Sequence, residues 1–200
     1  MFAKEPKAHY SSGERRLLLA VAAQSIEHGL NQGQPLEPAP SDYPEPLREP
    51  RATFVTLERE GALRGCIGSL EAIRPLVLDV ARNAFAAAFE DPRFQPLSRA
   101  EWPRLELHLS ILSPPERLDS ESESDLLGRL RPGVDGLILE DRGHRGTFLP
   151  SVWAQLPDPA EFMEHLRHKA GLPAGHWSDT LAVSRYTTES FGASIEEIFA

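Results

Sequence analysis

The single cysteine of the chain lies between two glycines and close to an arginine, in the sequence Leu-Arg-Gly-Cys-Ile-Gly that begins at Leu63. If this stretch is a β-strand, alternate side chains point to opposite faces, so Leu63 and Ile67 enter the core. Arg64, Cys66 and Gly68 then share the other face. A guanidinium beside a thiol favours the thiolate, which is the nucleophilic form. The stretch therefore predicts a thiol site in which Gly68 leaves room for a reactant.

A structural interpretation of the cysteine stays open, because cysteine is often a small buried hydrophobe in a strand. Gly65 would either let another backbone approach closely or mark a bulge, and a bulge would break the alternation. A nucleophilic Cys66 also needs a base within hydrogen-bond reach. His108, two residues from Ser110, is the nearest candidate on a predicted strand.

Charged side chains in three other motifs are suited to an anion-binding site. Arg64, Arg93 and Lys169 could bind a carboxylate or phosphate, and Asp91 and Asp135 could serve as acid, base or orienting groups. Taken singly, these residues are also typical of turns and of a helix C-terminus. We predict a site for a small anionic substrate with Cys66, Arg64, Asp91 and Lys169 as catalytic residues and Gly65, Gly68, Arg93, Ser110 and Asp135 as substrate-binding residues.

Two further patterns favour neither a metal nor a cofactor. His165 and His168 are three apart on a predicted helix, a spacing that can present two metal ligands. Both lie on the polar flank of that helix and no third ligand is evident, so a solvated pair is favoured. The residues 143–146 lack the spacing and the lysine of a phosphate-binding loop, and a hairpin turn explains them. We predict no metal site and no cofactor.

Composition limits the class of protein. The 200 residues with 40% hydrophobic content suffice for one domain, residues 1–200, that buries roughly 70% of its unfolded surface. The net charge of -9 argues against binding to the phosphate backbone of nucleic acid. No apolar run approaches the ~20 residues that a membrane span needs, and Met1–Tyr10 shows no signal region. With a single cysteine, which fits a reducing compartment, these features predict a cytoplasmic protein without a membrane contact.

Hydrophobic periodicity and turn residues predict helices that alternate irregularly with strands. Ser11 and Glu14 are spaced as a capping box for the first helix, which Gly29 could end. Residues 31–50 hold six prolines and predict a surface loop. The pattern favours an α+β fold with a mainly antiparallel sheet flanked by helices. The expected helices are 15–28, 75–88, 125–131, 160–170 and a short one capped by Ser194 and Glu197, and the expected strands are 52–58, 62–68, 104–112, 135–140, 147–150 and 180–188.

Several separated motifs occur together in the order found in one family. They are Phe54-Val55-Thr56-Leu57, Leu63 to Gly68, Asp91-Pro92-Arg93-Phe94, Leu109-Ser110-Ile111-Leu112, Asp135-Gly136-Leu137, Thr147-Phe148-Leu149-Pro150 and Lys169-Ala170-Gly171-Leu172. Over about residues 12–191 the chain resembles the AMMECR-type domain. The resemblance implies an α+β fold with a smaller second subdomain and a cleft between the two, but it implies no reaction. Ser151, where the family usually has Gln or Glu, and the proline-rich insert depart from the family pattern.

The resemblance extends to the A component of the AmmeMemoRadiSam system, which is found beside Memo-type and radical SAM proteins. It therefore implies partners of these two types. Two functions remain open from the sequence. One is an enzyme or enzyme component that uses the thiol of Cys66 on a small anionic substrate. The other is a non-catalytic binding module in which Cys66 is structural.

Overall fold

The computed structural model describes residues 10–200, and the chain divides into two compact units. The first unit comprises the chain up to Leu112 together with Glu189–Ala200, and the second comprises Ser113–Thr188. Each unit contains a four-stranded sheet and helices, so the predicted α+β class is confirmed. The strands form two sheets, one in each unit.

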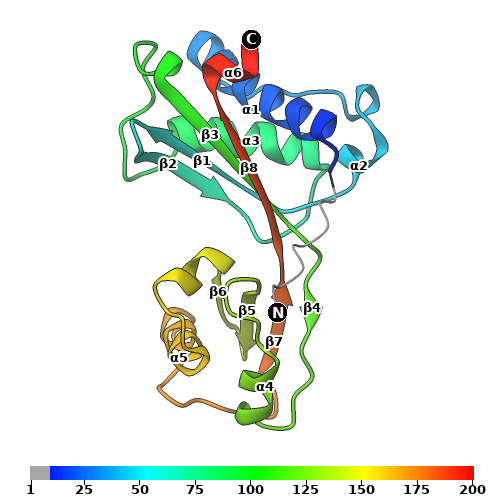
Figure 1. Cartoon of the computed structure of the whole chain (residues 1–200), viewed down its shortest axis with the longest axis vertical. Coiled ribbons are helices and arrows are strands. Elements are labelled where there is room, and N and C mark those ends of the chain that lie inside the picture. Colours follow the sequence, from blue (N-terminus) through cyan, green and yellow to red (C-terminus); the bar gives the residue numbers. More distant parts are fainter. Residues whose placement is uncertain (1–9) are drawn as a thin grey trace, which may run out of the picture. The chain divides into compact units, whose positions relative to one another are not determined.

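The sheet of the first unit has the strand order β2-β1-β3-β8 (Figure 1). These strands are β1 (Thr53–Arg59), β2 (Ala62–Gly68), β3 (Leu105–Leu112) and β8 (Thr188–Ser194). Helices α1 (Ser12–Gln32) and α3 (Leu76–Phe89) pack on each other and against this sheet. The alternation predicted for β3 is observed, because Leu105, Leu107 and Leu109 are buried in the same core as Leu57 of β1. The opposite face carries most of the polar side chains of β1 and β3, among them Thr56, Glu106 and His108.

The first helix begins as predicted and ends later than predicted. Ser11 and Glu14 form a capping box, so the N-terminal amides are satisfied. The helix continues through Gly29, where the rings of Phe85 and Phe89 occupy the space that a Cβ would need. It ends at Gly33, whose φ of 71° is the left-handed conformation of a helix C-cap. Gly29 is therefore a helix-packing residue and not the stop signal.

The proline-rich segment 31–50 contains only two short helical turns, η1 (Pro40–Asp42) and α2 (Glu45–Arg48). Leu47 is fully buried and anchors the segment in the core of the first unit. A third short turn, η2 (Trp102–Arg104), precedes β3, and helix α6 (Ile195–Phe199) follows β8. Ser194 and Glu197 cap α6 in the box that the sequence predicted.

The β1–β2 hairpin carries a bulge that changes which side chains share a face. Leu57 pairs with Gly65 and Glu58 pairs with Leu63, so Arg64 has no partner on β1. The expectation that Leu63 enters the core is wrong, because the bulge moves it to the surface, where it is 45% exposed. Gly65 faces α3, and a Cβ there would lie 2.1 Å from the carbonyl oxygen of Ala87. Both structural explanations offered for Gly65 therefore apply.

The second unit contains a sheet with the order β4-β7-β5-β6, whose recorded pairings are antiparallel. Trp153 stacks on Phe162 with ring centroids 3.8 Å apart in the core of this unit. None of the helices between residues 10 and 200 is long and apolar enough to cross a membrane. The elements of the unit are β4 (Glu116–Arg117), α4 (Glu123–Arg129), β5 (Gly136–Asp141), β6 (His144–Phe148), η3 (Pro150–Ala154), α5 (Pro159–Lys169) and β7 (Ala182–Tyr186).

The predicted strand over 180–188 is wrong in its extent, because two strands occupy the region. β7 ends at Tyr186 and β8 begins at Thr188, and the two strands belong to different sheets. Between them Thr187 exchanges hydrogen bonds with Ser113: its carbonyl accepts from the Ser113 amide, and its amide donates to the Ser113 hydroxyl. Thr187 thus pairs with Ser113 at the point where the chain passes from one sheet to the other.

Candidate functional site

Asp91 and Arg93 bind the backbone of Cys66 at the open edge of the first sheet. β2 is an edge strand, so its outward amide and carbonyl groups have no neighbouring strand. The Cys66 amide donates to the Asp91 carboxylate at 2.9 Å, and the Cys66 carbonyl accepts from Arg93 Nη2 at 3.2 Å. Arg93 also binds Asp91 through Nε at 3.0 Å and Nη2 at 2.7 Å. We call Asp91 and Arg93 the edge clamp.

The two charges of the edge clamp stabilise each other. The Asp91 side chain is 2% exposed, and the Arg93 guanidinium with the amides of Cys66 and Arg93 holds the pKa of its carboxyl well below the usual range. The pKa of Arg93 is raised, chiefly by the hydrogen bonds to Asp91 and also by the negative charge of that carboxylate. Arg93 is 54% exposed on its side chain, so one side of the guanidinium faces solvent.

The Cys66 side chain lies on the polar face of the sheet and is partly exposed. Thr56 lies directly opposite on β1, and its hydroxyl donates to Cys66 Sγ at 3.2 Å. His108 is opposite Thr56 on β3, so Thr56 separates the imidazole from the thiol by one strand. Within residues 10–200, no carboxylate or imidazole is recorded in hydrogen-bond contact with Sγ.

Gly68 does not provide the space beside the thiol that the sequence suggested. A Cβ at this position would lie 2.4 Å from the Phe54 ring and 2.4 Å from the Thr53 carbonyl oxygen. The glycine therefore lets Phe54 of the neighbouring strand lie over β2. Its role in the hairpin is a packing role.

Arg64 contacts the loop that follows α3. The bulge breaks the alternation that would have put Arg64 on the face of Cys66. Its Nε donates to Glu101 at 2.7 Å and its Nη2 donates to the carbonyl of Gln95 at 2.9 Å. Arg64, with the Ser98 amide and hydroxyl, lowers the pKa of Glu101 to about 2. Arg93 is the arginine recorded beside Cys66, and the sequence had assigned that place to Arg64.

The Phe94 ring joins the two arginines of this region. The guanidinium carbons of Arg64 and Arg93 lie 5.7 and 5.5 Å from the centroid of the ring, within cation–π range. Arg64 Nη1 is buried and lacks a hydrogen-bond partner among the described residues. The Asp-Pro-Arg-Phe motif thus supplies a carboxylate, a guanidinium and an aromatic ring to the environment of β2.

Ser110 belongs to the same sheet, two strands away from Cys66. It lies opposite Phe54 of β1, and its Oγ is 2.9 Å from Oγ of Ser190 on β8. Arg64, Cys66, Asp91, Arg93 and Ser110 are therefore all supplied by the first unit. Of these, Cys66, Asp91 and Arg93 are in direct contact.

Asp135 and Lys169 are supplied by the second unit. The Asp135 carboxylate is fully buried and accepts from the backbone amide and Nε of Arg131, both at 2.9 Å. The backbone carbonyl of Asp135 accepts a hydrogen bond from the indole of Trp153 at 2.6 Å. Lys169 Nζ lies 4.9 Å from the centroid of the Phe148 ring. These contacts hold structural elements of the second unit together.

The histidine pair of α5 has no third ligand within the described chain. His165 and His168 are exposed, and neither belongs to a cluster of side chains that could hold a metal. Glu58, Glu106 and His108 on β1 and β3 do form such a cluster among the described residues. From the sequence His108 was a candidate only for a base, because the register of β1 and β3 is needed to bring the two glutamates to it.

The family model AMMECR1 matches residues 19–191 of the chain. A protein of Methanothermobacter thermautotrophicus is 41% identical over 167 residues, which cover 83% of this chain and 86% of that protein. Protein PF1979 of Pyrococcus furiosus is 38% identical over 181 residues, covering 87% and 85% of the two chains. The crystal structure of the uncharacterized protein PH0010 from Pyrococcus horikoshii is similar with a TM-score of 0.78 and 36% identity, and the match covers 88% of this chain and 90% of that one.

Proposed function

The chain belongs to the AMMECR1 family, and we propose that its surface around Cys66 binds a small anionic ligand that meets the thiol. The observation that carries the proposal is the half-exposed guanidinium of Arg93, which donates to the carbonyl of Cys66 at 3.2 Å. A positive charge fixed beside a cysteine attracts an anion to the thiol.

The geometry of Arg93 leaves donors for a ligand. A guanidinium has five N–H donors, and the recorded bonds from Arg93 to Asp91 and Cys66 use only Nε and Nη2. Nη1 is therefore available for a carboxylate or a phosphate oxygen within the described part of the chain. Because Asp91 already offsets the charge of Arg93, we expect a ligand of modest affinity that is selected by its charge and its fit beside the thiol.

The thiol itself is held in a fixed position. Asp91 and Arg93 bind both backbone groups of Cys66, and the hydroxyl of Thr56 donates to its sulfur. We propose on this basis that the protein is an enzyme or enzyme component in the cytoplasm, with Cys66 as its reactive group and Arg93 as its anion-binding group.

Alkylation with two reagents of equal reactivity type and different charge tests this proposal. Iodoacetate is an anion and iodoacetamide is neutral, and both transfer a carbon to the sulfur with loss of iodide. We expect folded protein to react with iodoacetate faster, relative to iodoacetamide, than the urea-unfolded chain does. Arg93→Gln should lower this ratio several-fold, whereas Arg104→Gln, which changes a 69% exposed side chain on η2, should leave it unchanged. Equal ratios in all three folded proteins would refute an anion site at Arg93.

A second function is favoured because, within residues 10–200, Cys66 Sγ has no carboxylate or imidazole in hydrogen-bond contact that could serve as a base. In this alternative the motif residues shape a non-catalytic binding surface, and Cys66 is structural. The resemblance to the A component of the AmmeMemoRadiSam system supports Memo-type and radical SAM proteins as the partners. Co-purification with each partner type tests it. A thiol that reacts only after unfolding, together with a complex that Cys66→Ser preserves, would favour the binding module over the enzyme.

A further inference from the structure

Two glutamates and a histidine meet on the polar face of the first sheet, apart from the edge clamp. Glu58 on β1 lies directly opposite Glu106 on β3, and His108 is two residues from Glu106 on the same face. The Nε2 atom of His108 is 3.8 Å from a carboxylate oxygen of Glu58 and 4.0 Å from one of Glu106. The three ligand atoms all lie within 4.8 Å of one another.

The arrangement of the two carboxylates calls for a cation. Like charges directly opposite each other on neighbouring antiparallel strands repel, and they destabilise the pairing of those strands. The side chains of Glu58 and Glu106 are 36% and 52% exposed, so water weakens the repulsion without removing it. A divalent cation between the two oxygens would turn this repulsion into attraction.

The orientation of His108 is an independent indication of a ligand. Its Nε2 is inaccessible to solvent and lacks a hydrogen-bond partner among the described residues, since both carboxylate oxygens are beyond hydrogen-bond distance. The ring lies against Gly192 of β8, where a Cβ would be 2.4 Å from His108 Nδ1. The missing side chain of Gly192 therefore lets the ring turn Nε2 toward the two glutamates.

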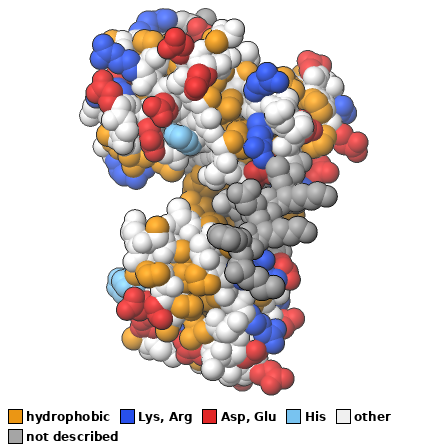
Figure 2. All heavy atoms as spheres, in the orientation of Figure 1, with side chains coloured by type: hydrophobic (Ala, Val, Ile, Leu, Met, Phe, Trp, Pro, Cys, Tyr) orange, Lys and Arg blue, Asp and Glu red, His pale blue; other side chains and the backbone are white. Residues whose placement is uncertain are grey.

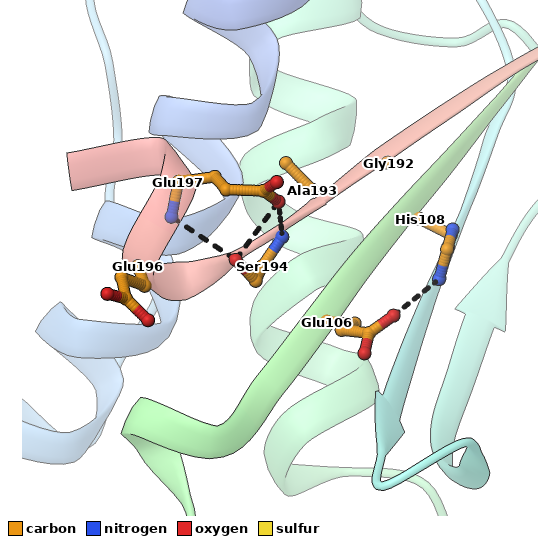
Figure 3. A pocket seen from close by; sticks show the side chains of 7 residues that line it. All are labelled: Glu106, His108, Gly192, Ala193, Ser194, Glu196 and Glu197. Atoms are coloured by element: carbon orange, nitrogen blue, oxygen red, sulfur yellow. Dashed lines mark hydrogen bonds and ion pairs between the residues drawn. The ribbon is translucent and has the colours of Figure 1, made fainter. Parts of the chain in front are cut away.

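A pocket of about 490 Å³ adjoins the cluster (Figure 3). Glu106 and His108 line it from β3, and Gly192, Ala193 and Ser194 line it from β8. Glu196 and Glu197 of α6 add further carboxylates to the wall, and Glu197 is engaged in the cap of α6. Figure 2 shows acidic and basic side chains interspersed over the face it draws. The pocket thus gives a metal ion access to solvent and an acidic surrounding.

The donor set and the distances select the class of metal. One imidazole nitrogen with two carboxylate oxygens suits zinc and similar first-row divalent ions, whereas magnesium and calcium prefer oxygen ligands alone. Two ligands at about 2.1 Å from a tetrahedral zinc ion are roughly 3.4 Å apart. The two separations from His108, 3.8 and 4.0 Å, exceed this value by less than about 1 Å, and all three ligand atoms lie within 4.8 Å of one another, so side-chain rotations must bring them closer around an ion.

We propose that Glu58, Glu106 and His108 bind a divalent first-row transition-metal ion of the zinc type, with its remaining coordination position open to the pocket. The sequence had predicted no metal site. The proposal is independent of the ligand proposed at Cys66 and Arg93.

Titration of the folded, tag-free protein with Zn²⁺ in a calorimeter and with Co²⁺ by visible absorption tests the proposal. We expect one ion to bind per chain, and we expect the absorption spectrum of bound Co²⁺ to be that of an ion with a low coordination number. Glu58→Gln, Glu106→Gln and His108→Asn should each weaken binding at least tenfold, since even the loss of an outer-sphere partner costs about 10- to 100-fold. Glu60→Gln is the matched control, because Glu60 is 71% exposed on the neighbouring turn and is not part of the cluster.

Unfolding curves of each variant separate loss of metal from loss of fold, because the three ligand side chains are partly exposed and the replacements are close in size. A failure of Zn²⁺ and Co²⁺ to saturate the wild-type protein would overturn the proposal. Binding that His108→Asn leaves intact would overturn it equally, because it would identify an acidic surface that attracts cations without a defined site. Equal weakening by Glu60→Gln would have the same meaning.

Discussion

The edge clamp predicts that Asp91→Asn destabilises the first unit and releases the backbone of Cys66. The Asp91 carboxylate accepts four hydrogen bonds, one from the Cys66 amide and three from the backbone and guanidinium of Arg93. An asparagine keeps one acceptor oxygen, and its amide group would face donors on the other side. Two hydrogen bonds to a charged acceptor are therefore lost. One of their donors is the half-exposed guanidinium of Arg93, and water weakens that bond. We expect the free energy of unfolding to fall by about 2–3 kcal/mol.

Urea unfolding at pH 7 measures this loss, and hydrogen exchange of the 62–68 segment locates it. The Cys66 amide should exchange faster in Asp91→Asn, because the carboxylate oxygen that accepts from it is replaced by a neutral amide oxygen or by an NH₂ group. Glu60→Gln serves as the control, since its partner Arg104 is 3.8 Å away and both side chains are exposed, so a change below about 0.5 kcal/mol is expected. An Asp91→Asn protein with wild-type stability and wild-type exchange at Cys66 would refute the clamp.

The pH dependence of the free energy of unfolding gives a second test of the Asp91 carboxylate. The pKa of Asp91 is well below its usual range in the folded protein, so the ionised form contributes stability above the unfolded pKa of about 3.9. This contribution is lost as the pH falls toward the folded pKa. The difference in stability between the wild type and Asp91→Asn should therefore be constant from neutral pH to about pH 5 and shrink below about pH 4. A difference that grows on acidification would contradict the assignment.

Two other residues give predictions of the same kind. In a urea titration, Gly65→Ala should lower the free energy of unfolding by at least about 2 kcal/mol, because its Cβ would meet a backbone oxygen of α3 at 2.1 Å. Gly13→Ala is the control, since the nearest atom to a Cβ at this helical position is 3.9 Å away. It should be neutral or slightly stabilising. Asp141→Asn should destabilise the second unit at pH 7, and its difference from the wild type should narrow below about pH 4 in acid titrations followed by Trp153 fluorescence. The Thr180 hydroxyl, with His176 and Ser178, lowers the pKa of Asp141 to about 2, so the stabilisation is lost as the pH falls toward that value.

The elements with strong local signals could be predicted from the sequence. The capping boxes at Ser11 and Ser194 were correct because a cap depends on residues three positions apart. The strand Leu105–Leu112 was correct because one of its faces is buried and the other is polar, which gives a strict alternation. Local spacing carries this information without any knowledge of tertiary contacts.

Elements that depend on distant partners could not be predicted in the same way. The helix was expected to end at Gly29, but two aromatic rings of α3 fill the space beside that glycine. Thr187, which separates β7 from β8, pairs with Ser113, which is 74 residues away in the chain. In both cases the deciding contact comes from another element, and propensity alone cannot identify it.

The candidate site shows the same division between local and distant information. The motifs around Cys66 and Asp91 were predicted to be functional from the sequence, and the structure joins Cys66, Asp91 and Arg93 by hydrogen bonds. The bulge at Arg64 was the feature that alternation could not anticipate, and with it Arg64 binds Glu101 whereas Arg93 contacts Cys66. A bulge is set by the register of two paired strands, which in turn depends on how β2 packs against α3.

The proposed metal ligands extend this argument. Glu58 and Glu106 are 48 residues apart, and only the antiparallel register of β1 and β3 puts them opposite each other with His108 beside them. A position in a sheet therefore has neighbours that its own motif does not contain. The edge clamp and the glutamate–histidine cluster lie on the same sheet, one at the free edge of β2 and the other across β1 and β3. The two groups share no residue. A substitution that removes metal binding at the cluster should therefore leave the reactivity of Cys66 measurable, and a substitution in the edge clamp should leave metal binding measurable.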